Sequence, residues 1–187
     1  DNVAVITELT GKNIVIPDTI QNCSKITFEV SSISSVESIE LSKNVTNLPY
    51  FGGCPSLKTF DMSKTTITSI PSNTFSGCNS LNNLYLNSSI IEIGSDAFSR
   101  CSSLTSIYYS GTISNWCGIT FNGSLSNPME ANTTSHFYIK DENGNLVKDE
   151  NGKTVMEAHK ALRMVDAKTQ TEHESAAEIL YKEIEPK

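Results

Sequence analysis

The side chains best suited to catalysis in this chain are three histidines and five cysteines. His136, His159 and His173 have neither the H-x-x-x-H nor the H-E-x-x-H spacing that places two imidazoles on one helix face around a zinc ion. No two cysteines have the C-x-x-C spacing of zinc and redox sites. Cys117 with His136 is the remaining pair for a nucleophile and a base, but a buried structural cysteine beside Trp116 is the favoured interpretation. We therefore expect no enzymatic activity, no cofactor and no metal site.

Composition narrows the classes of partner. The 187 residues include 14 basic and 21 acidic side chains, which gives a formal charge of −7. Nucleic-acid binding needs clustered Lys and Arg, so we expect no nucleic-acid partner. No stretch approaches the roughly 18 apolar residues that span a bilayer, so we expect no membrane insertion within this chain. The first residues do not resemble a secretory signal, and we expect that any such signal has been cleaved or lies outside this sequence.

The middle of the chain repeats itself about every 23 residues. Phe51, Phe75 and Phe98 lie 24 and 23 residues apart (75 − 51 and 98 − 75). The same intervals separate Cys54, Cys78 and Cys101, and likewise Leu57, Leu81 and Leu104. An earlier copy runs from Val36 to Leu41, and residues 14–28 form a degenerate one. Four to five coils are therefore predicted.

Each repeat contains L-x-x-L-x-L, whose last apolar pair alternates with polar residues as in a strand buried on one face. Stacking the strands merges their inward side chains into one core. The two predicted inward rows are Ile39, Phe60, Leu84, Ile107 and Leu41, Met62, Leu86, Tyr109. This period and signature predict an α/β leucine-rich-repeat solenoid, with a parallel β-sheet on the concave face and short helical or irregular turns on the convex face. Ser72-Asn73 and Ser95-Asp96 are the predicted caps of brief convex helices.

The three cysteines in the repeat share one position, so their side chains are predicted to form an inward column. A small side chain in a tight turn is favoured over disulfides or a metal site. The odd total of five cysteines supports free thiols.

The pattern I-x-x-I-P-x-x-x-F-x-G-C-x-S-L-x-x-L resembles the BspA-like branch of leucine-rich-repeat proteins. Residues 111–128, with Trp116 and Ser-Asn-Pro, and residues 136–147 resemble an element that terminates or links repeats in that family. The resemblance covers residues 36–147 well and 12–35 loosely. It implies a surface-exposed or secreted protein of a host-associated microbe, of a kind usually discussed as adhesins toward host matrix proteins or other microbes.

Charge density changes at residue 137, because residues 137–187 carry 19 charged side chains and residues 1–136 carry 16. We therefore expect a solenoid over residues 1–136, including a terminating element at 111–136, and a hairpin-and-helix appendage or cap over 137–187. Asn-Gly pairs in residues 140–155 favour a hairpin over a calcium loop. Trp116, Ile119 and Phe121 are the first candidates to cover the end of the core, and the helices expected within 156–184 are the second.

Strand alternation predicts which side chains leave the core on the concave face. The predicted partner-binding residues are Glu40, Asp61, Tyr85, Tyr108, Asn83, Asn87, Ser106 and Ser110. Adjacent exposed tyrosines on a rigid sheet suit a contact surface, whereas the alternative is that they only stabilise the sheet. We expect a non-catalytic binding or adhesion module, extracellular or at the cell surface, whose ligand is a protein or glycan such as host extracellular matrix. The other hypothesis is a structural spacer that positions another domain of a larger surface protein.

Overall fold

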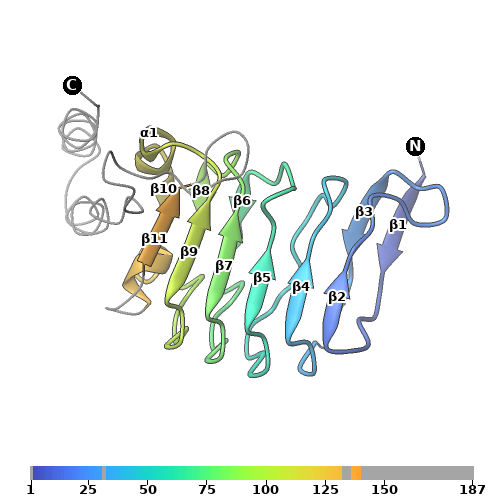
Figure 1. Cartoon of the computed structure of the whole chain (residues 1–187), viewed down its shortest axis with the longest axis horizontal. Coiled ribbons are helices and arrows are strands. Elements are labelled where there is room, and N and C mark those ends of the chain that lie inside the picture. The colour runs from blue at the N-terminus through green and yellow to red at the C-terminus, as the bar shows by residue number, and fades with distance from the viewer. Residues whose placement is uncertain (1, 31–32, 132–135, 140–187) are drawn as a thin grey trace, which may run out of the picture.

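A six-stranded parallel sheet runs from coil to coil along one side of the described part of the chain (Figure 1). The computed structural model describes residues 2–30, 33–131 and 136–139. In spatial order the strands are β2 (Asn13–Val15), β4 (Ser38–Glu40), β5 (Thr59–Asp61), β7 (Asn83–Leu86), β9 (Ser106–Tyr109) and β11 (His136–Ile139). Each strand pairs in parallel with its neighbour, one coil later in the chain. The predicted solenoid with a parallel sheet is therefore confirmed.

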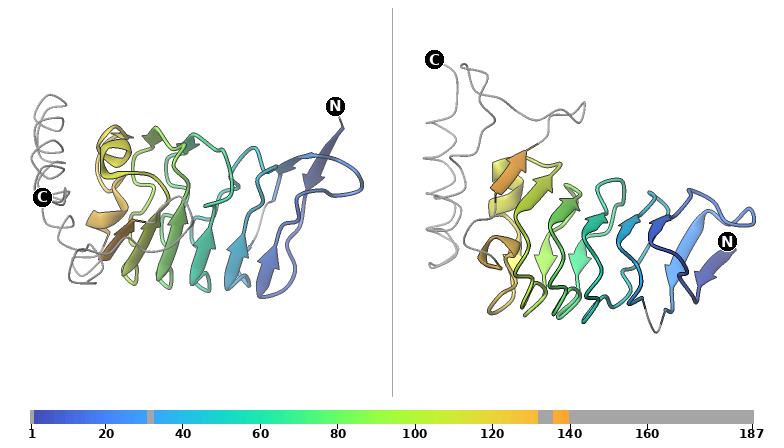
Figure 2. Two further views of the ribbon diagram at one scale, coloured as in Figure 1. Left: turned by 45° about the horizontal axis from the view of Figure 1, so that its top comes forward. Right: turned by 60° about the horizontal axis from the view of Figure 1, so that its bottom comes forward.

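The other side of the coils consists of turns and very short strands (Figure 2). One group is the three-stranded sheet of β6 (Ser69–Ile70), β8 (Glu92–Ile93) and β10 (Thr120–Phe121), and the other is the pair β1 (Val3–Ile6) and β3 (Lys25–Phe28). Irregular turns were predicted here, but the helices that Ser72-Asn73 and Ser95-Asp96 were expected to cap are replaced by turns. Asn73 and Asp96 have φ angles of 60° and 56°, a left-handed conformation that a right-handed helix cannot contain.

The core lies between these two sides and contains both predicted inward rows. All eight side chains of those rows are at most 1% exposed. Beside them the repeated phenylalanines stack, with ring centroids 5.4 Å apart for Phe51 and Phe75 and again for Phe75 and Phe98. Phe60 packs edge-on against Phe51 and Phe75 at 4.9 and 4.7 Å. The sequence repeat thus produces a continuous aromatic ladder.

The column of repeat cysteines is buried as predicted, at no more than 4% exposure for Cys54, Cys78 and Cys101. The Cys78 and Cys101 thiols donate hydrogen bonds to the carbonyl oxygens of Phe51 and Phe75, each at 3.1 Å. A small side chain with a weak donor therefore fits a tight turn and also satisfies a buried carbonyl of the preceding coil.

The expected degenerate first coil contributes to both sides of the solenoid. We call the side of the six-stranded sheet the front of the solenoid and the opposite side the back. Ile14 pairs in register with Ile39, so β2 is the front strand of this coil. Residues 25–28, which have a similar alternation, instead form β3 and pair with β1 on the back.

At the C-terminal end Trp116 and Ile119 are buried against the core, and Phe121 is half-buried beside them. The Trp116 ring meets Tyr109 edge-on at 5.2 Å, at the end of the helix α1 (Ile113–Cys117). After the 3₁₀ helix η1 (Pro128–Glu130), β11 pairs with β9 from His136–Ser106 to Ile139–Tyr109. The boundary expected between residues 136 and 137 falls inside this strand. The hairpin and helices expected after residue 139 lie outside the described residues.

Candidate partner-binding face

The register of the front sheet aligns one outward residue from each strand. Val15, Glu40, Asp61, Tyr85 and Tyr108 follow one another across β2, β4, β5, β7 and β9. We call these five residues the central row. Val15 is 67% exposed and the other four are partly exposed, so the row faces out of the core. This orientation was predicted for the four residues other than Val15.

Two tyrosines form the C-terminal half of the central row. The rings of Tyr85 and Tyr108 are stacked, with centroids 4.3 Å apart and planes 6° from parallel. Burial, followed by the nearby Tyr108 and Asp61, raises the pKa of the Tyr85 phenol above its ordinary value. The pair is therefore a preorganised aromatic block.

Two carboxylates form the acidic half of the row, and both have partners. The Lys64 ammonium contacts the Glu40 carboxylate, and this contact raises the pKa of Lys64. Asp61 accepts hydrogen bonds from the backbone N–H and the hydroxyl of Ser63, at 2.8 and 2.6 Å. These interactions orient the two carboxylates along the sheet beside the tyrosines.

The flanking row at the start of the strands agrees with the prediction. Asn83 and Ser106 are half-buried neighbours on β7 and β9, in register with Thr59 and Ser38. Their polar side chains border the tyrosine pair on one side.

The row expected on the other side does not form an open surface. Asn87 is only 2% exposed, and its amide donates to the Thr65 hydroxyl and the Ile67 carbonyl at 2.9 and 3.1 Å. The Ser110 hydroxyl is similarly turned to the carbonyl of Leu86, at 3.1 Å. Asn87 and Ser110 follow the last residues of β7 and β9, where the chain turns and strand alternation no longer sets side-chain direction. Asn87 is therefore a structural residue, and its predicted exposure was wrong.

Some surface features near the row were missed from the sequence. The Glu37 carboxylate forms salt bridges with two lysines of neighbouring coils, at 2.8 Å from the Lys12 ammonium and 2.7 Å from the Lys58 ammonium. Hydrogen bonds from these ammonium groups lower the pKa of Glu37 to about 2. The register also pairs Tyr138 of β11 with Tyr108. The period of about 23 residues could have located Lys12, Glu37 and Lys58, which lie 25 and 21 residues apart (37 − 12 and 58 − 37).

The candidate catalytic pair of Cys117 and His136 is not tested, because the His136 side chain lies outside what the structure describes. Cys117 is half-buried at the end of α1. Within the described part of the chain, no three His, Cys, Asp or Glu side chains are grouped as metal ligands would be. His159 and His173 lie outside that part. Its helices include none with the length and apolar character needed to cross a membrane.

Comparison with known proteins agrees with the stacked coils. A family model described as a BspA type leucine rich repeat region matches residues 7–127 in six copies. No curated protein and no solved structure matches the chain.

Proposed function

Because the chain belongs to the BspA-type leucine-rich-repeat family, we propose that it is a protein-binding module that holds its partner through the central row and works at a cell surface or outside the cell. Proteins of this family are commonly surface proteins, and repeat solenoids typically serve as non-catalytic binding scaffolds. Recognition of host extracellular matrix is the specific form of this proposal that the family resemblance favours.

The observation that carries the proposal is the stacked pair of Tyr85 and Tyr108 on the outer face of the sheet. Tyrosine offers a large contact area and loses little conformational entropy on binding. The pair is already ordered by stacking at 4.3 Å, and the strands beneath it are fixed by the core. A partner that docks on it therefore pays little additional ordering cost.

The orientation of the rings favours a protein over a glycan. Sugars stack on an open aromatic face, but Tyr85 and Tyr108 each cover one face of the other. Because the two facing ring surfaces are occupied by the stack, we infer that a partner meets mainly ring edges and hydroxyl groups. These groups suit the mixed apolar and polar contacts of a protein interface.

The spacer hypothesis has one observation in its favour, since stacked cross-strand tyrosines also stabilise a sheet. The two hypotheses differ in what removal of the rings does to binding. In a binder, the loss of both rings abolishes most of the affinity. In a spacer, it lowers stability alone.

The test is to screen the full chain against purified extracellular-matrix proteins and a glycan array, and then to titrate each hit with variants. Tyr85→Ala/Tyr108→Ala is expected to weaken binding by about 2 kcal/mol or more. Tyr50→Ala is the matched control, because Tyr50 is 62% exposed and lies outside the central row. A hit that binds the double variant and the unchanged chain equally would overturn the assignment of the face, and hits confined to the glycan array would overturn the choice of protein.

A further inference from the structure

The back of the solenoid is interrupted between the second and third coils. β1 and β3 form one short sheet, which an isolated parallel bridge from Ile26 to Val45 extends to the second coil. The other sheet starts with β6 in the third coil, and β6 is its edge strand. Among the described residues, no strand pairing joins 43–48 to 66–71.

The interruption has its origin in the length of the second coil. In this coil the stacked Phe51 lies ten positions after Leu41, the inward residue that follows β4 (51 − 41). In the third coil Phe75 lies thirteen positions after the equivalent Met62 (75 − 62). The shorter segment does not follow the course of β6, so the two coils separate on the back while their front strands remain paired.

On both sides of this gap, backbone groups point away from the neighbour with which that side is already paired. On one side, Ile26 donates to the Asn44 carbonyl and accepts from Thr46, both at 2.9 Å. The Val45 carbonyl between them therefore points the other way, toward the third coil.

On the opposite side, the carbonyls of Thr68 and Ile70 accept hydrogen bonds from Glu92 and Gly94 of the next coil. The N–H and C=O of Ser69, which lies between them, consequently point away from β8, on the edge of the sheet that has no paired strand. Unpaired strand edges of this kind are templates for another chain.

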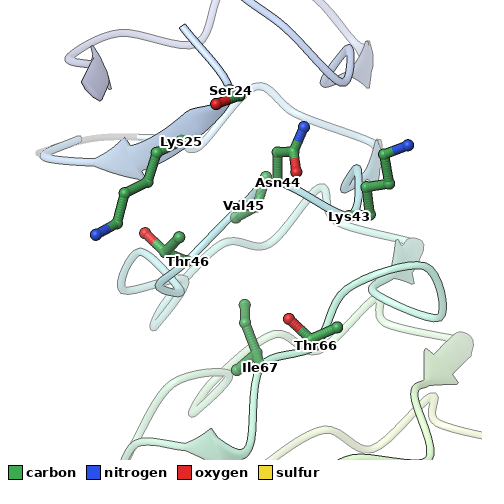
Figure 3. Close-up of a pocket in the computed structure, with 8 residues that line it drawn as sticks. All are labelled: Ser24, Lys25, Lys43, Asn44, Val45, Thr46, Thr66 and Ile67. Carbon is green, nitrogen blue, oxygen red and sulfur yellow. The ribbon is translucent and has the colours of Figure 1, made fainter. Parts of the chain in front are cut away.

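A groove of about 500 Å³ occupies the gap (Figure 3). Thr46 and Val45 lie on one side of it, and Thr66 and Ile67 lie on the other. Val45 and Ile67 are buried, whereas both threonines are exposed. The groove therefore has an apolar floor and hydroxyl-bearing walls.

The charge of the groove is positive. Its eight lining residues include two lysines, Lys25 and Lys43, and no carboxylate. Lys43 lies 3.3 Å from Asp18, but both side chains are more than half exposed. A pair this exposed is weak, so an incoming carboxylate can replace Asp18.

We propose that this groove binds an extended acidic peptide of another protein, which adds a strand between residues 45–47 and β6. The peptide backbone would pair with the Val45 carbonyl and with the N–H and C=O of Ser69. Its apolar side chains would rest on Val45 and Ile67, and its carboxylates would meet Lys25 and Lys43. This mode of recognition is β-strand addition, in which main-chain hydrogen bonds supply affinity and side-chain pockets supply specificity.

Hydrogen exchange of the full chain tests whether the edge is open. Without a peptide, the Ser69 amide is expected to exchange within about tenfold of the free-peptide rate, while the amides of Glu92 and Gly94 are protected by their bonds to β6. Strong protection of Ser69 in dilute protein would overturn the proposal, because the edge would then already be paired. Protection that appears only at high protein concentration would assign the groove to a second copy of this chain and would also overturn it.

A displayed library of random dodecapeptides is the probe for binding. Selected peptides are expected to be acidic, to lack proline at their centre, and to slow exchange of the Ser69 amide at least about tenfold. Peptides that bind without changing this amide would contradict strand addition.

Ser69→Pro removes one outward N–H, a change that an edge strand tolerates, and is expected to weaken peptide binding about fivefold to tenfold. Ser69→Ala keeps the N–H and is the matched control. Should Ser69→Pro fail to fold, Thr66→Trp at an exposed position fills the groove and is expected to abolish binding. Retained binding in Thr66→Trp would overturn the proposal. Tyr85→Ala/Tyr108→Ala is expected to bind the peptides normally. Peptide binding in the groove can therefore be tested independently of the function proposed for the central row.

Discussion

The Cys101 thiol donates a hydrogen bond to the carbonyl oxygen of Phe75, 26 residues earlier and one coil away, at 3.1 Å. Cys78 makes the same contact with Phe51. Each thiol therefore links two coils at the position where the phenylalanine ladder stacks. The repeat cysteine therefore has a structural role, although a thiol alone would suggest a reactive one.

The first prediction concerns the reactivity of these thiols. Burial raises the pKa of Cys101 to about 12, and the thiolate is the reactive form. Thiol reagents at neutral pH are expected to label Cys54, Cys78 and Cys101 only after unfolding, as mass spectrometry of labelled peptides can show. The half-buried Cys23 and Cys117 serve as internal controls and should react sooner. Rapid native labelling of the column would contradict its place in the core.

The second prediction concerns the shared core. Leu84 is fully buried between Phe60 and Ile107 in the inward row, so Leu84→Ala is expected to lower the free energy of unfolding by about 2–5 kcal/mol. Denaturant titration measures this difference. Ser106→Ala on the outer face is the control, with an expected change within about 0.5 kcal/mol. An equally small effect at Leu84 would mean that the strand faces are reversed.

The third prediction concerns Asn87, which bonds to two groups of the preceding coil. In Asn87→Ala the buried Ile67 carbonyl loses a donor and the Ser89 amide loses its acceptor, Asn87 Oδ1 at 2.7 Å. The expected loss in the free energy of unfolding is about 1–3 kcal/mol. Asn83→Ala, at the first residue of β7 and half-buried on the outer face, is expected to change it by less than about 0.5 kcal/mol. Similar values for both variants would contradict the structural role of Asn87.

Strand periodicity made the core predictable from sequence, because alternation determines whether a side chain such as Leu84 faces in or out. The same rule failed at Asn87, since it holds only while the chain remains extended. The predicted helix caps failed because Asn73 and Asp96 adopt left-handed turns, which both residue types tolerate well. The pairing of Tyr138 with Tyr108 was missed because the change in charge density placed the expected boundary after residue 136, inside β11.

The fourth prediction concerns the pH dependence of Glu37. Its pKa of about 2 lies below the ordinary value, so its two lysine pairs stabilise the folded chain above the unfolded pKa. This contribution is lost as the pH falls through the folded pKa, and it is small because both lysine side chains are largely exposed. NMR titration is expected to place the carboxyl midpoint near 2. The variant Lys12→Met/Lys58→Met should raise it toward the ordinary value, and an unchanged midpoint would show that the lysines are not its partners in solution.

The last prediction separates the structural contribution of Tyr85 and Tyr108 from their proposed contribution to binding. A double-mutant cycle of Tyr85→Ala and Tyr108→Ala, measured by denaturant unfolding, is expected to give a coupling energy of about 0.5–1.5 kcal/mol, because the rings stack directly. Each variant is expected to keep the fold, since both side chains point outward from a core they do not enter. A coupling energy near zero would mean that the stack does not form in solution. The loss of affinity expected for a binding face, about 2 kcal/mol or more, exceeds this coupling and is measured on folded protein. Stability that falls by the coupling while affinity for a verified ligand is unchanged would identify the pair as a brace for the sheet.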